Sequence, residues 1–166
     1  MTEDGTRPDA AVPADAADFM RRNGRTFMIT LRADGSPTAH PMAGFYGGAL
    51  YLNTYRKSVK ARNLGRDDRI CCVLTNPSDA AGFEGALYRG RARMLSDEEV
   101  FAPEVPPGLA WARNPRSQGS QEQPDVPPED ERRIGETAGR IKRGVRVIFE
   151  VGAEEAGMLA EVRDES

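Results

Sequence analysis

Three strand-like segments near the N-terminus are joined by very short turns, and this feature constrains the fold more than any other. Apolar and polar residues alternate over 26–31, and Asp34-Gly35 leads into a second segment over 38–43. Tyr46-Gly47-Gly48 then turns the chain into a third segment over 49–54. Asp-Gly and Gly-Gly pairs favour tight hairpins. Parallel strands need a long crossover between them, so these three segments are predicted to form an antiparallel meander.

The rest of the chain continues this pattern of short strands with small helices between them. Ser96-Asp97-Glu98-Glu99 is a capping box that opens a helix. Further strands are predicted at 69–75, 84–95 and 145–151, and helices at 14–23, 58–65, 129–142 and around 154–161. The fold class is therefore mainly β (α+β): a six-stranded antiparallel barrel, closed or half-closed, with short flanking helices.

A length of 166 residues suits a single domain. Residues 1–13 are interpreted as a disordered leader, 14–151 as the barrel domain and 152–166 as an acidic tail. Residues 103–128 contain seven of the twelve prolines and the only tryptophan, Trp111. This segment is predicted to be a long surface excursion, with three alternatives left open: an ordered substrate lid, a dimer contact or a disordered segment.

Charge and composition exclude several functional classes. The net charge of −3 disfavours nucleic acid as a partner, although residues 19–149 carry 21 basic and 15 acidic side chains. No apolar run is long enough to span a membrane, and no secretory signal is visible, so no membrane association is expected. Two adjacent cysteines, Cys71 and Cys72, favour a reducing cytoplasmic location and are interpreted as buried spectators. A single histidine, His40, excludes multi-histidine zinc sites, and no metal is predicted.

The strongest functional signal lies at residues 54–63, where a strand runs into a helix N-terminus. Hydroxyl and basic side chains gather there: Thr54, Tyr55, Arg56, Lys57, Ser58, Lys60 and Arg62. Unpaired backbone N–H groups, the positive end of the helix dipole and nearby cations together make an anion site, with a phosphate as the natural ligand. The alternative is a solvated basic helix face.

The first hairpin is a second candidate region. Met28 and Thr30 are predicted to face His40, Pro41 and Met42, forming either a wall against a planar ring or ordinary core packing. His40 could be an axial heme ligand, a hydrogen-bond donor to a bound ring or a satisfied strand histidine. Arg89, Arg91 and Arg93 share one strand face and could meet a ligand's anionic tail, a partner subunit or solvent.

The order of these parts resembles the FMN-binding split barrel, the superfamily of pyridoxamine 5′-phosphate oxidase-like proteins. The resemblance rests on three runs in order: RTFMITL, DGSP and HPM over 25–42; LYLNT, SVK and RNL over 50–64; and ALYRGRA over 86–92. It spans about residues 19–98. The family's usual proline after the helix's aspartate is missing from Asp67-Asp68-Arg69.

The resemblance implies a homodimer with a flavin or deazaflavin in a groove between subunits. Carried over by motif, Ser58 and Lys60 would bind the cofactor phosphate, assisted by Arg56 or Lys57. Thr30, His40, Pro41 and Met42 would line the ring, and Thr54 and Tyr55 would lie between ring and phosphate. Hydride chemistry would belong to the cofactor, and no catalytic acid is assigned.

Two functional hypotheses follow. The first is an oxidoreductase that uses coenzyme F420 or FMN to reduce an unsaturated or conjugated small molecule; the chain looks closer to short actinobacterial F420-binding members. The second is a non-catalytic flavin- or heme-binding protein of the same fold, with His40 as the possible iron ligand. Loss of heme absorbance in a His40→Ala variant with intact flavin binding would support the second.

Overall fold

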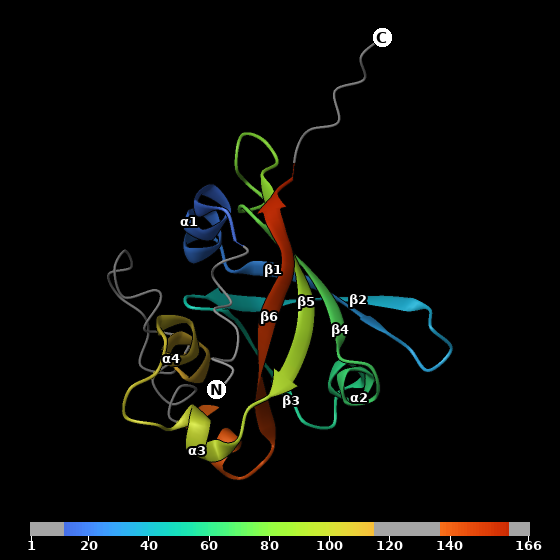
Figure 1. Ribbon diagram of the computed structural model, residues 1–166, viewed down its shortest axis with the longest axis vertical. Helices are drawn as coiled ribbons and strands as arrows, with labels where there is room; N and C mark the ends of the chain where they lie inside the picture. Colours follow the sequence, from blue (N-terminus) through green and yellow to red (C-terminus); the bar gives the residue numbers. More distant parts are fainter. Residues whose placement is uncertain (1–11, 115–136, 160–166) are drawn as a thin grey trace, which may run out of the picture.

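The computed structural model describes residues 12–114 and 137–159, and their strands form a closed barrel (Figure 1). Every strand pair is antiparallel, in the order β1-β2-β3-β6-β5-β4 with β4 pairing back to β1. The elements are α1 Ala14–Arg22, β1 Arg25–Leu31, β2 Pro37–Tyr46, β3 Leu50–Tyr55, α2 Val59–Arg66, β4 Arg69–Thr75, β5 Gly85–Met94, α3 Asp97–Val100, α4 Pro107–Arg113 and β6 Arg146–Met158. The predicted fold class is confirmed.

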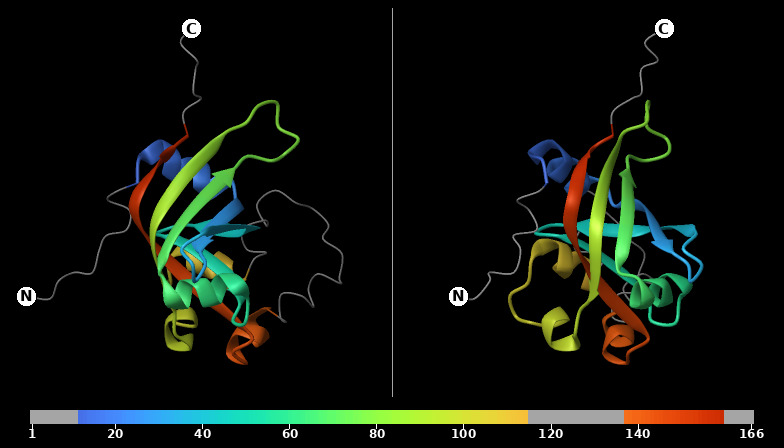
Figure 2. Two further views of the ribbon diagram at one scale, coloured as in Figure 1. Left: turned by 90° about the vertical axis from the view of Figure 1, so that its right-hand side faces the viewer. Right: turned by 45° about the vertical axis from the view of Figure 1, so that its right-hand side comes forward.

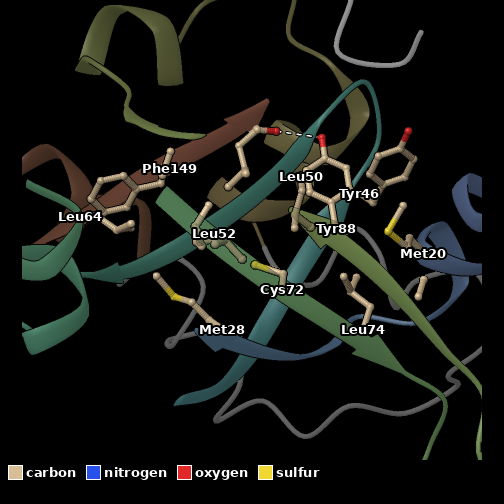
Figure 3. Close-up of a cluster of buried hydrophobic side chains, with 14 of the residues drawn as sticks. Met20, Met28, Tyr46, Leu50, Leu52, Leu64, Cys72, Leu74, Tyr88 and Phe149 are labelled. Carbon is tan, nitrogen blue, oxygen red and sulfur yellow. Dashed lines mark hydrogen bonds between the residues drawn. The ribbon is translucent and has the colours of Figure 1, made fainter. Parts of the chain in front are cut away.

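Side-chain alternation along the strands fills the barrel from within. On β1, Thr26, Met28 and Thr30 are buried, whereas Phe27, Ile29 and Leu31 face outward and are half-buried. The interior core also includes side chains from helices α1 and α2. Figure 3 shows Met20 of α1 and Leu64 of α2 at opposite ends of this core. Figure 2 shows the same helices toward the two ends of the barrel.

A second apolar cluster lies outside the barrel, where α4 packs on β2 and β3. Leu109 and Ala112 of α4 are buried there against Phe45, Tyr51 and Ile148. Close backbone contact holds the helix in place, since the Gly108 N–H donates to the Gly47 carbonyl over 3.1 Å. The predicted excursion therefore begins with a packed helix, and Trp111 is half-buried against this cluster. Residues 115–128 of the excursion lie outside the described ranges.

The last strand is longer than predicted. β6 continues past Val151 to Met158 and pairs with β5 to its end, so the short helix expected around 154–161 is wrong for its described part. A bulge at Arg89/Gly90 shifts the register, and Gly152 lies against Gly90. Ala153, Ala156 and Met158 are apolar, and two glutamates separate the first two. Over so few residues this spacing also fits a helix, and pairing with β5 makes the segment a strand.

β2 and β3 separate soon after the turn that joins them. Their pairing covers only Gly44↔Leu52, Phe45↔Tyr51 and Tyr46↔Leu50. Farther from the turn, residues 37–43 of β2 pair with β1 alone. Residues 53–55 of β3 likewise pair with β6 alone. The barrel is therefore split along this seam. No helix within the described ranges is long and apolar enough to cross a membrane.

Candidate functional site

A cavity of about 310 Å³ opens where β2 and β3 diverge. Its lining comes from both strands, from α2, from the helical segment 137–142 and from the start of β6. The lining residues are Met42, Ala43, Phe45, Asn53, Thr54, Tyr55, Lys60, Thr137 and Arg146. The split thus brings four of the predicted site residues, Met42, Thr54, Tyr55 and Lys60, to one place.

Two cations face this cavity, and none of its described lining residues is acidic. Burial, with a smaller contribution from Arg146, lowers the pKa of the Lys60 ammonium from its ordinary 10.5. Arg146 lies with its guanidinium carbon 4.2 Å from the centre of the Tyr55 ring, and its Nε is buried without a partner in the described part of the chain. Two cations at one cavity, with no acidic side chain in its described lining, favour an anionic ligand.

Ser58 opens α2 directly beside this cavity. Its Oγ accepts a 3.2 Å hydrogen bond from the Ala61 N–H, which fixes the start of the helix. The same oxygen lies 3.3 Å from Oγ1 of Thr54, and either hydroxyl can donate. The predicted strand–loop–helix arrangement at residues 54–60 is therefore present, with the hydroxyls of Thr54 and Ser58 adjacent to each other.

Arg56 and Lys57 point elsewhere. Arg56 donates from Nε to the Gly144 carbonyl over 2.8 Å and from Nη1 to Sδ of Met94. Lys57 is exposed and does not line the cavity. Arg56 instead links the loop between β3 and α2 to the segment just before β6. β6 begins with Arg146, which lines the cavity.

Of the four predicted ring-facing residues, only Met42 lines the cavity. Pro41 is exposed on the outer face of β2. His40 points inward opposite Met28, and its Nδ1 is buried without a partner in the described ranges. Burial first, then Lys60 and Arg32, lower the pKa of the His40 imidazole from its ordinary 6.5, which favours the neutral ring.

Thr30 does not reach the cavity. Its side chain is fully buried, and Oγ1 accepts a 3.0 Å hydrogen bond from Nδ2 of Asn63. This contact anchors α2 to β1 inside the barrel, so Thr30 positions the helix that carries Lys60. Met28 is fully buried core, and Cys72 is buried beside it while Cys71 is half-buried on the opposite side of β4.

Sequence reasoning missed Arg146, Asn53 and Phe45. Arg146 is the first residue of β6 and registers with Tyr55 through the β3–β6 ladder. Asn53 lies within the predicted strand over 49–54, and Phe45 lies between the predicted strand over 38–43 and the turn at 46–48. The available signal was weak: two polar residues, Asn53 and Thr54, follow one another at the end of an otherwise apolar strand.

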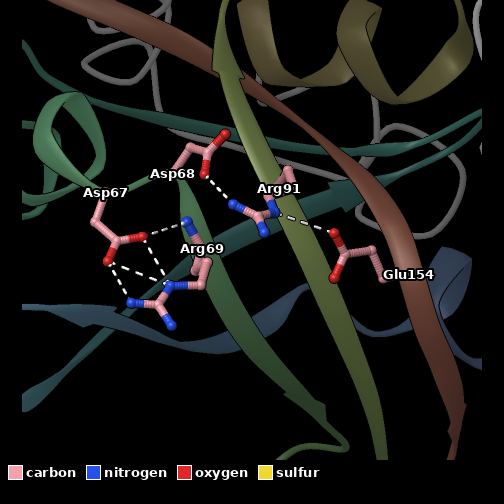
Figure 4. Close-up of polar contacts among 5 residues, drawn as sticks. All are labelled: Asp67, Asp68, Arg69, Arg91 and Glu154. Atoms are coloured by element: carbon pink, nitrogen blue, oxygen red, sulfur yellow. Dashed lines mark hydrogen bonds and ion pairs between the residues drawn. The ribbon is translucent and has the colours of Figure 1, made fainter.

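The three arginines of β5 bind acidic residues within the chain rather than facing the cavity. Arg91 pairs with Asp68 and Glu154, as Figure 4 shows. Arg89 pairs with Glu155, and Arg93 with Glu99 and Glu150. Asp67 forms a salt bridge with Arg69 near these pairs. Hydrogen bonds from Arg69 lower the pKa of the Asp67 carboxyl to about 2. None of the three alternatives left open for these arginines included pairing with carboxylates of the same chain, which is what the structure shows at this exposed surface.

Residues 12–130 match the sequence model of the family described as pyridoxamine 5′-phosphate oxidase, which covers more than half of the chain. The chain belongs to this family. No curated protein matches the chain significantly.

Solved structures share the fold of this family member at low sequence identity. A conserved hypothetical protein from Mycobacterium tuberculosis is 22% identical, with a TM-score of 0.60 over 90% of this chain and 86% of its own. An F420 reductase is 18% identical, with a TM-score of 0.58 over 88% of this chain and 98% of its own. The heme storage protein HutZ from Vibrio cholerae is 14% identical, with a TM-score of 0.60 over 90% and 94%.

Proposed function

We propose that this protein binds a flavin or deazaflavin, FMN or coenzyme F420, at the split between β2 and β3. The observation that carries the proposal is the pairing of Lys60 and Arg146 at one cavity whose described lining has no acidic residue. A cofactor phosphate would neutralise both cations, and the hydroxyls of Ser58 and Thr54 would supply hydrogen bonds. The site's donor set therefore fits a phosphate-bearing ligand.

The remainder of the cavity suits the ring of such a cofactor. Met42, Ala43 and Phe45 give it an apolar side, and the Tyr55 ring gives it an aromatic one. When bound, a flavin or deazaflavin supplies hydride transfer. The protein's residues would hold and orient it, and the reaction would be the reduction or oxidation of an unsaturated or conjugated small molecule.

F420 is the cofactor we favour. Basic side chains continue from the cavity onto the surface around residues 140–146, where Arg140 donates to the Tyr55 hydroxyl over 3.3 Å. An anionic tail beyond the phosphate would meet these cations. One solved structure of the same fold is an F420 reductase, which is consistent with this choice.

A homodimer would complete the site. Outward-facing residues of β2 and β1 make an apolar face next to the cavity, and Ala43 belongs to both. This outer face comprises Ala39, Pro41, Ala43, Phe27, Ile29 and Leu31. A second cavity, of about 400 Å³, is lined by Ile29 and Leu31 of this face and by Cys71 of β4. Since no described element covers this face, a second copy of the chain is the partner we propose.

Heme binding is the second candidate function. It is favoured by His40, whose inward-facing imidazole has a pKa lowered by burial and a buried Nδ1 without a partner in the described ranges. A neutral imidazole is the form that binds iron. The heme storage protein among the solved structures has the same fold.

Fluorescence titrations with FMN and with F420, and an absorbance titration with hemin, test these proposals. We expect saturable binding of F420 or FMN, weakened about tenfold or more by Lys60→Ala through loss of a charge-assisted contact. Lys57→Ala removes an equal charge outside the cavity and should change affinity far less. Binding of hemin alone, lost in His40→Ala, would overturn the redox proposal in favour of heme.

A further inference from the structure

The amide of Asn53 is fixed in one orientation by α4. Its Nδ2 donates a 2.8 Å hydrogen bond to the Ala112 carbonyl. That carbonyl lies in the last turn of α4, where backbone oxygens lack partners within the helix. A flipped amide would place two oxygens against each other. The helix therefore orients the side chain so that Oδ1 faces away from Ala112.

Oδ1 of Asn53 is buried and has no partner in the described part of the chain. Asn53 also lines the cavity at the split, alongside apolar Phe45 and Ala43. A buried acceptor without a donor raises the free energy of the folded state, because it has lost its hydrogen bonds to water. A ligand that brings an N–H or O–H group to this point would recover that free energy, whereas a ligand with an acceptor there would be disfavoured.

The position of Asn53 separates it from the anion-binding residues. It lies two residues before Tyr55 on the same face of β3, which corresponds to about 7 Å along the strand. Arg146 is opposite Tyr55, whereas Ile148 is opposite Asn53. The apolar surroundings of Asn53 suit a ring rather than a phosphate or a polyol chain.

We propose that Asn53 is a specificity-determining residue that accepts a hydrogen bond from the imide N–H of the bound ring. This N–H belongs to the pyrimidinedione part that flavins and deazaflavins share. The inference rests on the proposed function and adds a chemical criterion to it: the site selects ring systems with an imide donor. It also gives α4 a role in the site, since α4 orients the amide.

Paired ligands test this assignment through a ratio of affinities. The probes are FMN and N3-methyl-FMN, with F420 and its N3-methyl derivative as the second pair, titrated against the apoprotein. In the wild type we expect methylation to weaken binding about tenfold or more, because it removes the donor. In Asn53→Leu the two members of a pair should bind nearly equally.

Asn53→Asp separates ring recognition from the support of α4. It retains an acceptor oxygen but loses the N–H that bonds Ala112, so discrimination against the methylated ring should persist even if the melting temperature falls. An equal methylation effect in wild type and Asn53→Leu, or its loss in Asn53→Asp, would overturn the assignment alone. Failure of the wild type to bind either unmethylated cofactor would overturn both the proposed function and this inference.

Discussion

Lys60 illustrates how the environment of a single residue changes its chemistry. In the sequence it is one of several cations on a helix, but the fold half-buries it at the same cavity as Arg146 and lowers the pKa of its ammonium. The exposed Lys57, three residues earlier, has no such neighbour at the cavity. Only one of these two lysines therefore lines the cavity that we propose binds a phosphate, and the distinction is invisible in the sequence.

The lowered pKa of Lys60 predicts a defined pH dependence for the proposed cofactor binding. A bound phosphate favours the charged ammonium, so the pKa of Lys60 is higher in the complex than in the free protein. Affinity should therefore hold at neutral pH and fall as pH rises through the lowered pKa of the free protein, below the ordinary 10.5. Titrations of FMN or F420 between neutral and alkaline pH measure this decline.

Lys60→Arg is the matched variant for that experiment, because a guanidinium stays charged across the whole range. It should retain neutral-pH binding and flatten the alkaline decline. A decline of equal steepness in the variant would show that another group titrates, and Lys60 would then not be the cation that binds the phosphate.

At the scale of elements, a close glycine contact sets the position of α4. A Cβ on Gly108 would lie 2.8 Å from the Phe45 carbonyl oxygen, the Gly47 nitrogen and Cδ2 of Tyr51. Two of these are backbone atoms that cannot rotate away. The contact brings α4 near enough for Ala112 to hold Asn53, so packing outside the barrel determines the shape of the cavity.

Gly108→Ala should accordingly lower the free energy of unfolding by about 1–3 kcal/mol, the usual effect of overpacking. Gly65→Ala is the control: Gly65 lies within α2, a Cβ there meets nothing within 4 Å, and alanine should stabilise the helix by about 0.5–1 kcal/mol. Denaturant unfolding of the two variants measures both effects. Equal stability of Gly108→Ala and wild type would mean that α4 can shift freely.

At the scale of the whole molecule, the barrel has two different outer surfaces. β5 and β6 carry a network of exposed ion pairs, each contributing little to stability on its own. β1 and β2 carry apolar side chains instead, adjacent to the cavity. The charged surface is suited to water, and the apolar one is the surface on which we propose that a second copy of the chain binds.

Ala39→Glu tests that dimer. Ala39 is exposed in the protomer, so the substitution leaves the core intact but places a charge in the proposed interface. Sedimentation analysis should show a dimer for the wild type and a monomer for the variant. Phe83→Glu, at a 66% exposed position in the β4–β5 loop, should remain dimeric. A dimer that persists in Ala39→Glu would place the interface elsewhere.

The sequence was a good guide where neighbouring residues decide the structure. The Asp34-Gly35 turn, the helix start at Ser58 and the capping box at Ser96 all form as predicted, because each depends on contacts within a few residues. It was a poor guide to β6 beyond Val151 and to the role of Thr30. Both depend on a distant partner, β5 in one case and Asn63 in the other.

What the sequence alone determined about this protein is the antiparallel barrel and the hydroxyl-rich, basic turn that leads into α2, since tight turns and caps are local. Only the tertiary structure decided which residues meet at the site. The β3–β6 ladder brings Arg146 to Tyr55 from the far end of the chain, and α4 orients Asn53. The split between β2 and β3 then opens the cavity they share, because strand pairing ends at Gly44 and Leu52.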